Sequence, residues 1–380
     1  MMQISPETQL FIREHSSDDV RVLALQAKKY PDIDMPTAIT QIAGRKVAAE
    51  KIPSWWEIEK IWYPKHLSLE QCSSEITARY KARLLQGDSL TDLTGGFGID
   101  CSFLATGFKS ATYVERQEEL CEIAAHNFPV LNLNHINIKN EDGVTYLQAM
   151  SPVDCLFLDP ARRNEHGGKT VAISDCEPNV AELEELLLQK ANRVMIKLSP
   201  MLDLSLALKE LKQTQEVHIL SVNNECKELL ILLGQTSPAE ISIHCVNLFT
   251  KGTQKEQHFV FTREQEQCSE CTYTDSLETY LYEPNASLLK AGAFRSIAAA
   301  YPVRKLHPNS HLYTSDTFIE NFPGRIFRIV NQCSFNKKEV KENLADLKKA
   351  NVTVRNFPAT VAELRKRIHL ACLLYTSDAA

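Results

Sequence analysis

The pattern of apolar and polar positions changes near residue 88. Before it, residues 36–52 and 68–85 place apolar side chains three and four positions apart, which predicts amphipathic helices. From residue 89 onward, short β-branched or apolar runs alternate with helical stretches. This alternation is typical of βαβ units, which build a parallel sheet with helices on both faces. The pattern therefore predicts an N-terminal helical region over residues 1–87 and an α/β domain after it.

Seven apolar runs are the predicted strands of the α/β domain. They cover residues 89–94, 111–115, 135–139, 154–159, 193–199, 216–222 and 228–234. The last two runs are too close in sequence for a helical crossover, so we expect an antiparallel pair there. Two more runs, 241–248 and 257–263, predict a β extension, which places the domain at 88–275. The polar residues 264–276 are predicted to link it to a C-terminal module.

The composition is that of a globular protein. The 380 residues are 44% hydrophobic and 24% charged, which is close to the average for folded domains. We find no run of about 18 apolar residues and no basic stretch followed by an apolar core, so we expect a soluble, cytoplasmic protein without a membrane partner. The 11 cysteines are scattered and are expected to be reduced. The CxxC of Cys268 and Cys271 lacks further ligands at matching spacing, and we expect no metal.

Positive charge is concentrated near the C-terminus. The whole chain has a formal net charge of −6, but residues 284–370 contain 15 Lys and Arg against 6 Asp and Glu, a local net charge of +9. Such a stretch is either an ordinary solvated surface or a site for a polyanion. We favour nucleic acid because the excess is not confined to one predicted helix. The contributing residues include Lys337, Lys338 and Lys341 in that helix, and Arg295, Arg304, Lys305, Arg325, Arg328 and Arg355 outside it.

The first predicted strand runs into the glycine-rich stretch "DLTGGFGID". Its spacing is not the dinucleotide pattern G-x-G-x-x-G, because Cys101 stands where the last glycine belongs, so a nicotinamide cofactor is not expected. Instead, Asp92 at the strand end is followed by Gly96 and Gly98 four and six positions later. This arrangement resembles the first motif of class I S-adenosylmethionine-dependent methyltransferases. The resemblance implies S-adenosyl-L-methionine as cofactor.

The resemblance also implies roles for polar residues along the sheet. Glu115 closes the second strand, where a carboxylate accepts both ribose hydroxyls. Asp142 matches the position that holds the adenine amine, or it caps the helix that begins there. Thr94 and Asp100 flank the turn and are expected to reach the methionine end of the cofactor. The predicted cofactor-binding residues are Asp92, Thr94, Gly95, Gly96, Phe97, Gly98, Asp100, Glu115, Arg116, Asp142 and Gln71.

The fourth strand ends in "LDPARR", where we expect the chemistry. Methyltransferases of exocyclic base amines place an Asp or Asn, two prolines and an aromatic ring there. This chain has Asp159 and Pro160, but Ala161 and Arg162 replace the second proline and the ring, which weakens the case for amine methylation. Cys155 lies about 13 Å along the strand, too far to serve as a nucleophile for C5-pyrimidine methylation.

The predicted catalytic residues are thus Asp159, Pro160 and Arg162. The predicted substrate-binding residues are Arg163, Lys197, Ser199, Lys337, Lys338 and Lys341. Arg162 and Arg163 either bind phosphate or a base, or form structural salt bridges. Lys197 is the only charge in its apolar run, and Ser199 follows it at the same sheet edge. The polar loop after the two arginines, which contains Gly167 and Gly168, is suited to ordering over a substrate.

Over nearly its whole length the chain is similar to a family of bacterial class I methyltransferases with a C-terminal THUMP-like domain. The matching stretches include "DLTGGFGID", "FLDPARR", "EPNASLLKAGAF" and "HPNSHLYTS". Membership implies a Rossmann-like class I methyltransferase sheet with an N-terminal helical region and a small α+β C-terminal module. The module is expected to comprise a ferredoxin-like segment at 276–322 and a THUMP-like segment at 323–370, related to RNA-binding modules. Residues 371–380 are expected to be a non-native tail.

These observations predict an S-adenosylmethionine-dependent methyltransferase that acts on a tRNA or rRNA base. Two alternatives compete with this prediction. A class I enzyme that modifies a protein or small molecule would use the same cofactor site, with a structural C-terminal module. A non-catalytic RNA-binding protein with a vestigial sheet would have lost the cofactor carboxylates, which are present.

Overall fold

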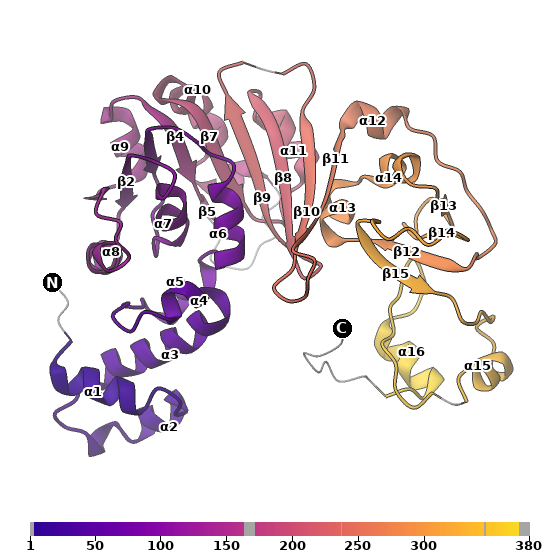
Figure 1. The fold of residues 1–380 in the computed structure, drawn as a ribbon, viewed down its shortest axis with the longest axis horizontal. Helices are drawn as coiled ribbons and strands as arrows, with labels where there is room; N and C mark the ends of the chain where they lie inside the picture. Colours follow the sequence, from indigo (N-terminus) through magenta and orange to yellow (C-terminus); the bar gives the residue numbers. More distant parts are fainter. Residues whose placement is uncertain (1–3, 163–171, 237, 346, 372–380) are drawn as a thin grey trace. The chain divides into compact units, whose positions relative to one another are not determined.

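The computed structural model describes residues 4–162, 172–236, 238–345 and 347–371 (Figure 1). The chain forms two compact units. The first comprises Met1–Val217 and Glu228–Ala239, and the second His218–Lys227 and Glu240–Ala380. The division passes through strands β8 (Thr214–Val222) and β9 (Glu225–Gly234). The glycine turn and the ends of the fourth and fifth predicted strands therefore lie together in the first unit.

The first unit begins with helices, as the sequence predicts. They are α1 (Pro6–Glu14), α2 (Val20–Leu25), the 3₁₀ turn η1 (Ala27–Lys29), α3 (Met35–Lys51), α4 (Pro53–Trp56), α5 (His66–Gln71) and α6 (Glu75–Ala82). Side chains of Ser5, Asp19 and Asp34 accept backbone hydrogen bonds and so fix the starts of α1, α2 and α3. These three helices bury an apolar cluster that includes Phe11 and Ile42.

The single helix predicted over 68–85 is in fact two helices. α5 ends and α6 begins because Cys72 and Ser74 are extended, with ψ angles of 160° and 155°. Short polar side chains favour such a break, since they compete with helical hydrogen bonds and are preferred at helix starts. The break carries Ser73 into the interior, where it is 4% exposed.

One nine-stranded sheet has the order β11-β10-β8-β9-β7-β4-β1-β2-β3. Its other strands are β1 (Ser89–Asp92), β2 (Ser110–Glu115), β3 (Ile136–Asn140), β4 (Val153–Leu158), β7 (Ala191–Leu198), β10 (Ser242–Leu248) and β11 (Glu256–Thr262). Strands β1 to β4 and β7 pair in parallel, whereas β9 is antiparallel to β7 and β11 to β10. This topology confirms the predicted α/β sheet.

Helices flank the sheet (Figure 1). They are α7 (Ile99–Ala105), α8 (Glu118–Val130), α9 (Gly143–Ala149), α10 (Val180–Lys190) and α11 (Leu204–Glu210). After β4, the short strands β5 (Ala161–Arg162) and β6 (Cys176–Glu177) pair, with η2 (Ile173–Asp175) just before β6. Because β1 lies between β4 and β2, the strand order reverses at β1, and α/β sheets bind ligands at the carboxyl end of such a strand.

The second unit contains a four-stranded sheet of order β13-β14-β12-β15. Its elements are β12 (Tyr280–Pro284), α13 (Ala286–Ala291), α14 (Phe294–Ala300), β13 (Arg304–Lys305), β14 (Tyr313–Ser315), β15 (Gly324–Arg328), α15 (Lys337–Asn343) and α16 (Val361–Ile368). The predicted linker 264–276 is partly helical. It includes most of α12 (Arg263–Cys268), whose Glu266 accepts backbone hydrogen bonds at the start of α14.

The helices in the described part of the chain lack the combined length and hydrophobicity of a membrane span.

Candidate functional site

The loop between β1 and α7 is a tight glycine turn. Gly96 and Gly98 have φ angles of 54° and 86°, which glycine adopts without the strain that other residues incur. A Cβ atom on Gly95 would lie 2.3 Å from the ring of Tyr113, so a side chain there would collide with β2. The Tyr113 hydroxyl in turn donates a hydrogen bond to the carbonyl of Gly96 over 2.5 Å. These contacts fix the turn at the carboxyl end of β1.

Asp92 ends β1 and is 1% exposed. Its Oδ1 accepts a hydrogen bond from the backbone N–H of Thr94 over 2.9 Å, whereas its Oδ2 has no partner among the described residues. Burial raises the pKa of the Asp92 carboxyl to about 8; the Thr94 N–H opposes the rise, and the carboxylates of Asp100 and Asp159 add to it. A buried carboxylate oxygen without a partner is costly, so a cationic group beside Oδ2 would be stabilised there.

Glu115 and Asp142 occupy the ends of β2 and β3, as predicted. Glu115 is 8% exposed, and its two oxygens accept hydrogen bonds from the backbone N–H groups of Gly96 and Gln117 over 2.9 and 2.8 Å. It therefore already connects the glycine turn to β2. Asp142 caps α9 through Oδ1, which accepts from the backbone N–H groups of Val144 and Thr145. The capping alternative is thus observed, and contact with an adenine amine stays a prediction.

Three other predicted cofactor residues have different surroundings. The side chain of Phe97 packs into the core, with its ring 5.2 Å from that of Trp55, so only its backbone faces the turn. Arg116 is exposed and lies 3.7 Å from Glu177. Gln71 is exposed at the end of α5. The helix break after Gln71 places Ser73, rather than Gln71, beside the buried charges of the site.

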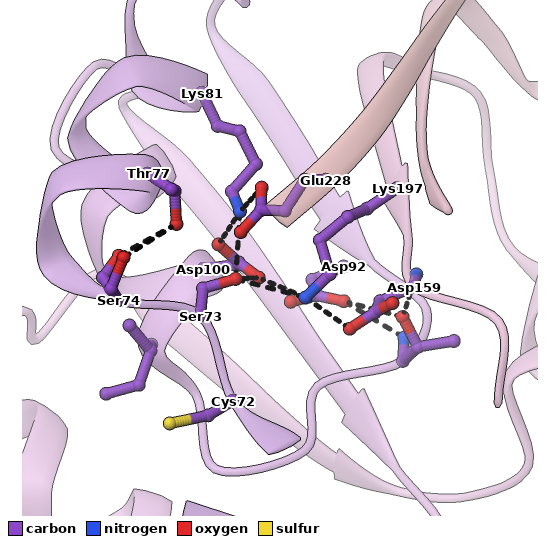
Figure 2. A network of polar contacts seen from close by, with 12 residues as sticks. Cys72, Ser73, Ser74, Thr77, Lys81, Asp92, Asp100, Asp159, Lys197 and Glu228 are labelled. Carbon is purple, nitrogen blue, oxygen red and sulfur yellow. Dashed lines mark hydrogen bonds and ion pairs between the residues drawn. The ribbon is translucent and has the colours of Figure 1, made fainter. Parts of the chain in front are cut away.

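Buried charges surround Lys81 (Figure 2). Lys81 is 0% exposed, and its Nζ lies 2.9 Å from Oδ1 of Asp100 and 2.6 Å from Oε2 of Glu228. It also donates a hydrogen bond to Ser73 Oγ over 2.8 Å. These contacts join α6 to α7 and β9. Burial opposes the charge on Asp100, but Lys81 and Lys197 outweigh it and hold the pKa of Asp100 well below its usual value.

The same network continues through Lys197 to the end of β4. Its Nζ lies 2.5 Å from Oδ2 of Asp159 and 3.3 Å from Oδ2 of Asp100, and it donates to Ser73 Oγ over 3.0 Å. Burial acts to lower the pKa of Lys197, but the carboxylates of Asp159 and Asp100 raise it well above its usual value. Lys197 is therefore a buried cation shared by two carboxylates.

Asp159 stands beside the glycine turn. Its backbone N–H donates to Thr94 Oγ1 over 2.6 Å, so Thr94 connects Asp159 with Asp92. Its side chain keeps 37% exposure, in contrast with that of Asp92. Desolvation raises the pKa of Asp159, and Lys197 acts against this rise. The adjacent Pro160 is buried.

Of the remaining predicted residues of this region, only some lie within the described part of the chain. Arg162 lies in β5, opposite Cys176 of β6, whereas Arg163 and the loop with Gly167 and Gly168 lie outside the described residues. Ser199 accepts a hydrogen bond from the backbone N–H of Met201 in the turn after β7. Cys155 is buried in β4, and burial raises the pKa of its thiol to about 11, which argues against a thiolate nucleophile.

Three arginines of the C-terminal basic stretch pair with acidic residues. Arg304 pairs with Glu278, while Arg325 and Arg355 both pair with Glu283, which is 4% exposed. The positive charges of these arginines are therefore compensated within the second unit.

The lysines of this stretch differ among themselves. Lys305 is 3% exposed and donates to the carbonyl of Pro308 over 2.7 Å. In contrast, Lys337, Lys338 and Lys341 are exposed on α15.

The second unit also holds a row of histidine rings on neighbouring strands. The ring centroids of His218 and His244 are 4.3 Å apart, and those of His244 and His258 are 5.3 Å apart. Nδ1 of His244 and Nε2 of His258 lie 3.1 Å apart, the distance of a hydrogen bond. Which of the two nitrogens donates depends on the tautomers of the rings.

Three members of the buried network, Ser73, Lys81 and Glu228, were not predicted from the sequence. Lys197 was identified as a single charge among apolar neighbours. That signal marks neither Lys81, which stands between Arg79 and Arg83, nor Glu228, which follows Lys227. Their convergence is also hidden, because α6 and β9 are far apart in sequence.

Comparisons with known proteins agree with this picture. Residues 280–323 match a ferredoxin-like domain model, and residues 324–378 match a THUMP domain-like model. β15 lies in the second match but completes the sheet of the first. No curated protein matches the chain.

Solved structures provide a match over almost the whole chain. The crystal structure of a "putative methyltransferase" from Porphyromonas gingivalis W83 is 34% identical, with a TM-score of 0.85, and the match covers 98% of this chain and 94% of that one. A "putative methyltransferase" from Streptococcus mutans in complex with SAH is 13% identical, with a TM-score of 0.31, over 42% of this chain and 96% of that one. An rRNA methylase from Streptococcus thermophilus is 14% identical, with a TM-score of 0.32, over 42% and 94%. The first match shows that the chain belongs to the family of the Porphyromonas gingivalis protein, methyltransferases with C-terminal ferredoxin-like and THUMP-like domains.

Proposed function

We propose that this protein transfers the methyl group of S-adenosyl-L-methionine to a base of tRNA or rRNA. The observation that carries the cofactor assignment is the unpartnered, buried Oδ2 of Asp92 beside the glycine turn. S-adenosyl-L-methionine has a sulfonium and an α-ammonium group, and a cation at Oδ2 would compensate the buried carboxylate. Glu115 would accept the ribose hydroxyls, and Asp142 the adenine amine, through the oxygen that does not cap α9.

When bound, the cofactor supplies an activated methyl group. The protein's own contribution is then to hold the acceptor atom in line with that group, and positioning of this kind can supply several kcal/mol of the barrier. Asp159 is suited to this task because it lies beside the turn, is partly exposed, and is held by Lys197 and Thr94. Pro160 restricts the backbone that follows.

The C-terminal module supports RNA as the substrate. The match to a THUMP domain-like model and the exposed lysines Lys337, Lys338 and Lys341 of α15 suit contacts with phosphates. One observation favours the second candidate, a protein or small-molecule substrate. Arg304, Arg325 and Arg355 are paired with glutamates, so the module offers less free positive charge than its composition suggests.

The test is a comparison of methylated nucleosides from total RNA of a strain that lacks the gene and of its parent, by mass spectrometry. We expect one methylated nucleoside to be absent from the deletion strain and restored by the wild-type gene, but not by Asp159→Ala. Unchanged RNA nucleosides, with transfer of labelled methyl groups to protein or small molecules in an extract, would support the second candidate.

A further inference from the structure

Lys197 lies between the carboxylates of Asp100 and Asp159 (Figure 2). An ammonium group has three hydrogens to donate, and Nζ of Lys197 has three oxygen neighbours, on Ser73, Asp100 and Asp159. The residue is 8% exposed. Its donors are therefore used within the protein, which argues against the direct substrate contact that the sequence suggested for Lys197.

We propose that Lys197 is a positioning residue for methyl transfer and acts through Asp159, an inference that rests on the proposed function. It holds Oδ2 of Asp159 and keeps the carboxylate ionised, so that Oδ1 accepts a hydrogen bond from the methyl acceptor. Lys81 is the natural comparison, because it is also buried and also pairs with Asp100. Its second ion pair is with Glu228 rather than with Asp159.

The charges around Asp159 explain why it needs Lys197. Asp100 faces it from α7 and Asp92 from the end of β1, and both disfavour a negative charge on Asp159. Lys81 of α6 favours that charge from a greater distance, and Lys197 of β7 does so in direct contact. Without Lys197, desolvation and the neighbouring carboxylates would leave Asp159 protonated at a higher pH.

An ionised Asp159 selects the class of acceptor. A carboxylate only accepts hydrogen bonds, so the acceptor group must carry a hydrogen. A base nitrogen with an N–H fits best. Its lone pair forms the new N–C bond as the S–C bond of the sulfonium breaks, the nitrogen becomes positively charged, and its proton passes to Asp159 and then to water. A hydroxyl would have to lose its proton to a much weaker base than it requires.

The first test needs no acceptor. Carboxyl carbons of aspartate are labelled with ¹³C in the full-length protein, Asp159 is assigned with Asp159→Asn, and its titration is followed by NMR. In Lys197→Met we expect the titration midpoint of Asp159 to rise by about one pH unit or more, the usual effect of removing an adjacent opposite charge. In Lys81→Met it should rise by less than half as much. Equal midpoints in the wild type and Lys197→Met would overturn the proposal. If Lys197→Met does not fold, Asp100→Asn is added to it to reduce the uncompensated negative charge. The reference is then Asp100→Asn alone, because Asp100 itself affects the Asp159 midpoint.

The second test measures transfer of labelled methyl groups to RNA from the deletion strain as a function of pH. Lys197→Met should lower the transfer rate by on the order of 10-fold to 10²-fold, the usual effect of a misplaced catalytic group. The acid limb of its pH–rate profile should move to higher pH. In an Asp159→Asn background the same substitution should cost less than about 3-fold, because residues that act through each other are not additive. The proposal would be overturned if Lys197→Met lost the same factor in rate with and without Asp159→Asn, and if the acid limb of its pH–rate profile stayed where it is in the wild type. A wild type that transfers no methyl groups to RNA would reject the RNA assignment, while the NMR titration would still decide the role of Lys197.

Discussion

The cofactor side of the site and the C-terminal basic stretch contain charges of very different character. Around the glycine turn, charges are buried and joined in one network, and one carboxylate oxygen, Oδ2 of Asp92, is left without a partner among the described residues. In the C-terminal stretch, three arginines pair with Glu278 and Glu283, and exposed lysines lie on α15. A buried carboxyl oxygen without a partner favours a specific ligand, whereas a count of surface charges is only an upper limit on the potential that a polyanion meets.

Among the substitutions that test this difference, we expect the largest effect on turnover from a change of Asp159. Asp159→Ala should lower turnover by on the order of 10²-fold, because the acceptor is no longer held in line. Affinity for S-adenosyl-L-methionine, measured by calorimetry, should change little, since Asp159 lies on the acceptor side. Parental turnover of this variant on the identified substrate would show that the acceptor is held elsewhere, with Ser199 the next residue to test.

Glu115 probes the ribose end of the cofactor side. Glu115→Ala should cost about 1.5–3 kcal/mol of cofactor binding free energy, the value of hydrogen bonds to a charged group. Glu115 also accepts the Gly96 and Gln117 N–H groups, so Glu115→Gln is the control that keeps the side chain's shape and part of its hydrogen bonding. Calorimetric affinity equal to that of the wild type in both variants would remove Glu115 from the site.

The exposed lysines test the other region. Replacing Lys337, Lys338 and Lys341 with Gln should lower the slope of log K for RNA against log salt by up to roughly one unit for each phosphate that is no longer neutralised. Filter binding from low to physiological salt measures this slope. A wild type whose binding does not depend on salt would favour a protein or small-molecule substrate.

Arg325, one of the paired arginines, is the matched control for the exposed lysines, and its substitution should have the smallest effect on RNA binding. Arg325 is 46% exposed, and its pair with Glu283 is partly screened by solvent. Arg325→Gln should therefore cost at most about 1 kcal/mol of stability and leave the salt slope almost unchanged. Chemical denaturation measures the change in stability, and the same filter-binding assay measures the salt slope. A decrease in slope as large as that from a lysine would show that the Arg325–Glu283 pair opens when RNA binds.

Much of the fold followed from local pattern. Alternating apolar runs predicted the strands of the sheet. The short connection between β8 and β9 predicted that they pair, and they are neighbours in the sheet. The glycine turn and the places of Glu115 and Asp142 were found because they depend on residues close in sequence to strand ends. The break between α5 and α6 was not found, since apolar spacing continues across Cys72–Ser74.

The partners of the charges could not be predicted. Lys81, Lys197 and Glu228 come from α6, β7 and β9, and no local signal shows that they meet. In the same way, the sequence counts Arg325 and Arg355 as free positive charge, but both approach Glu283 in the folded unit. Long-range pairing, which depends on tertiary structure, decides which charges remain for a ligand.

If Asp92 binds the cation of S-adenosyl-L-methionine, the protonation of Asp92 controls cofactor affinity. With a pKa of about 8, Asp92 is mainly neutral at pH 6–7.5 and must release a proton to bind a cation as a carboxylate. Affinity should therefore rise about tenfold per pH unit over this range, by one proton linked to binding. Above it the cofactor's own α-amino group loses its charge. The measurement is calorimetric titration with S-adenosyl-L-methionine at several pH values, with Asp92→Asn as the control. We predict the rise for the wild type, and weaker, pH-independent binding for Asp92→Asn. Equal affinities in both proteins at every pH, or no binding by the wild type, would contradict the account.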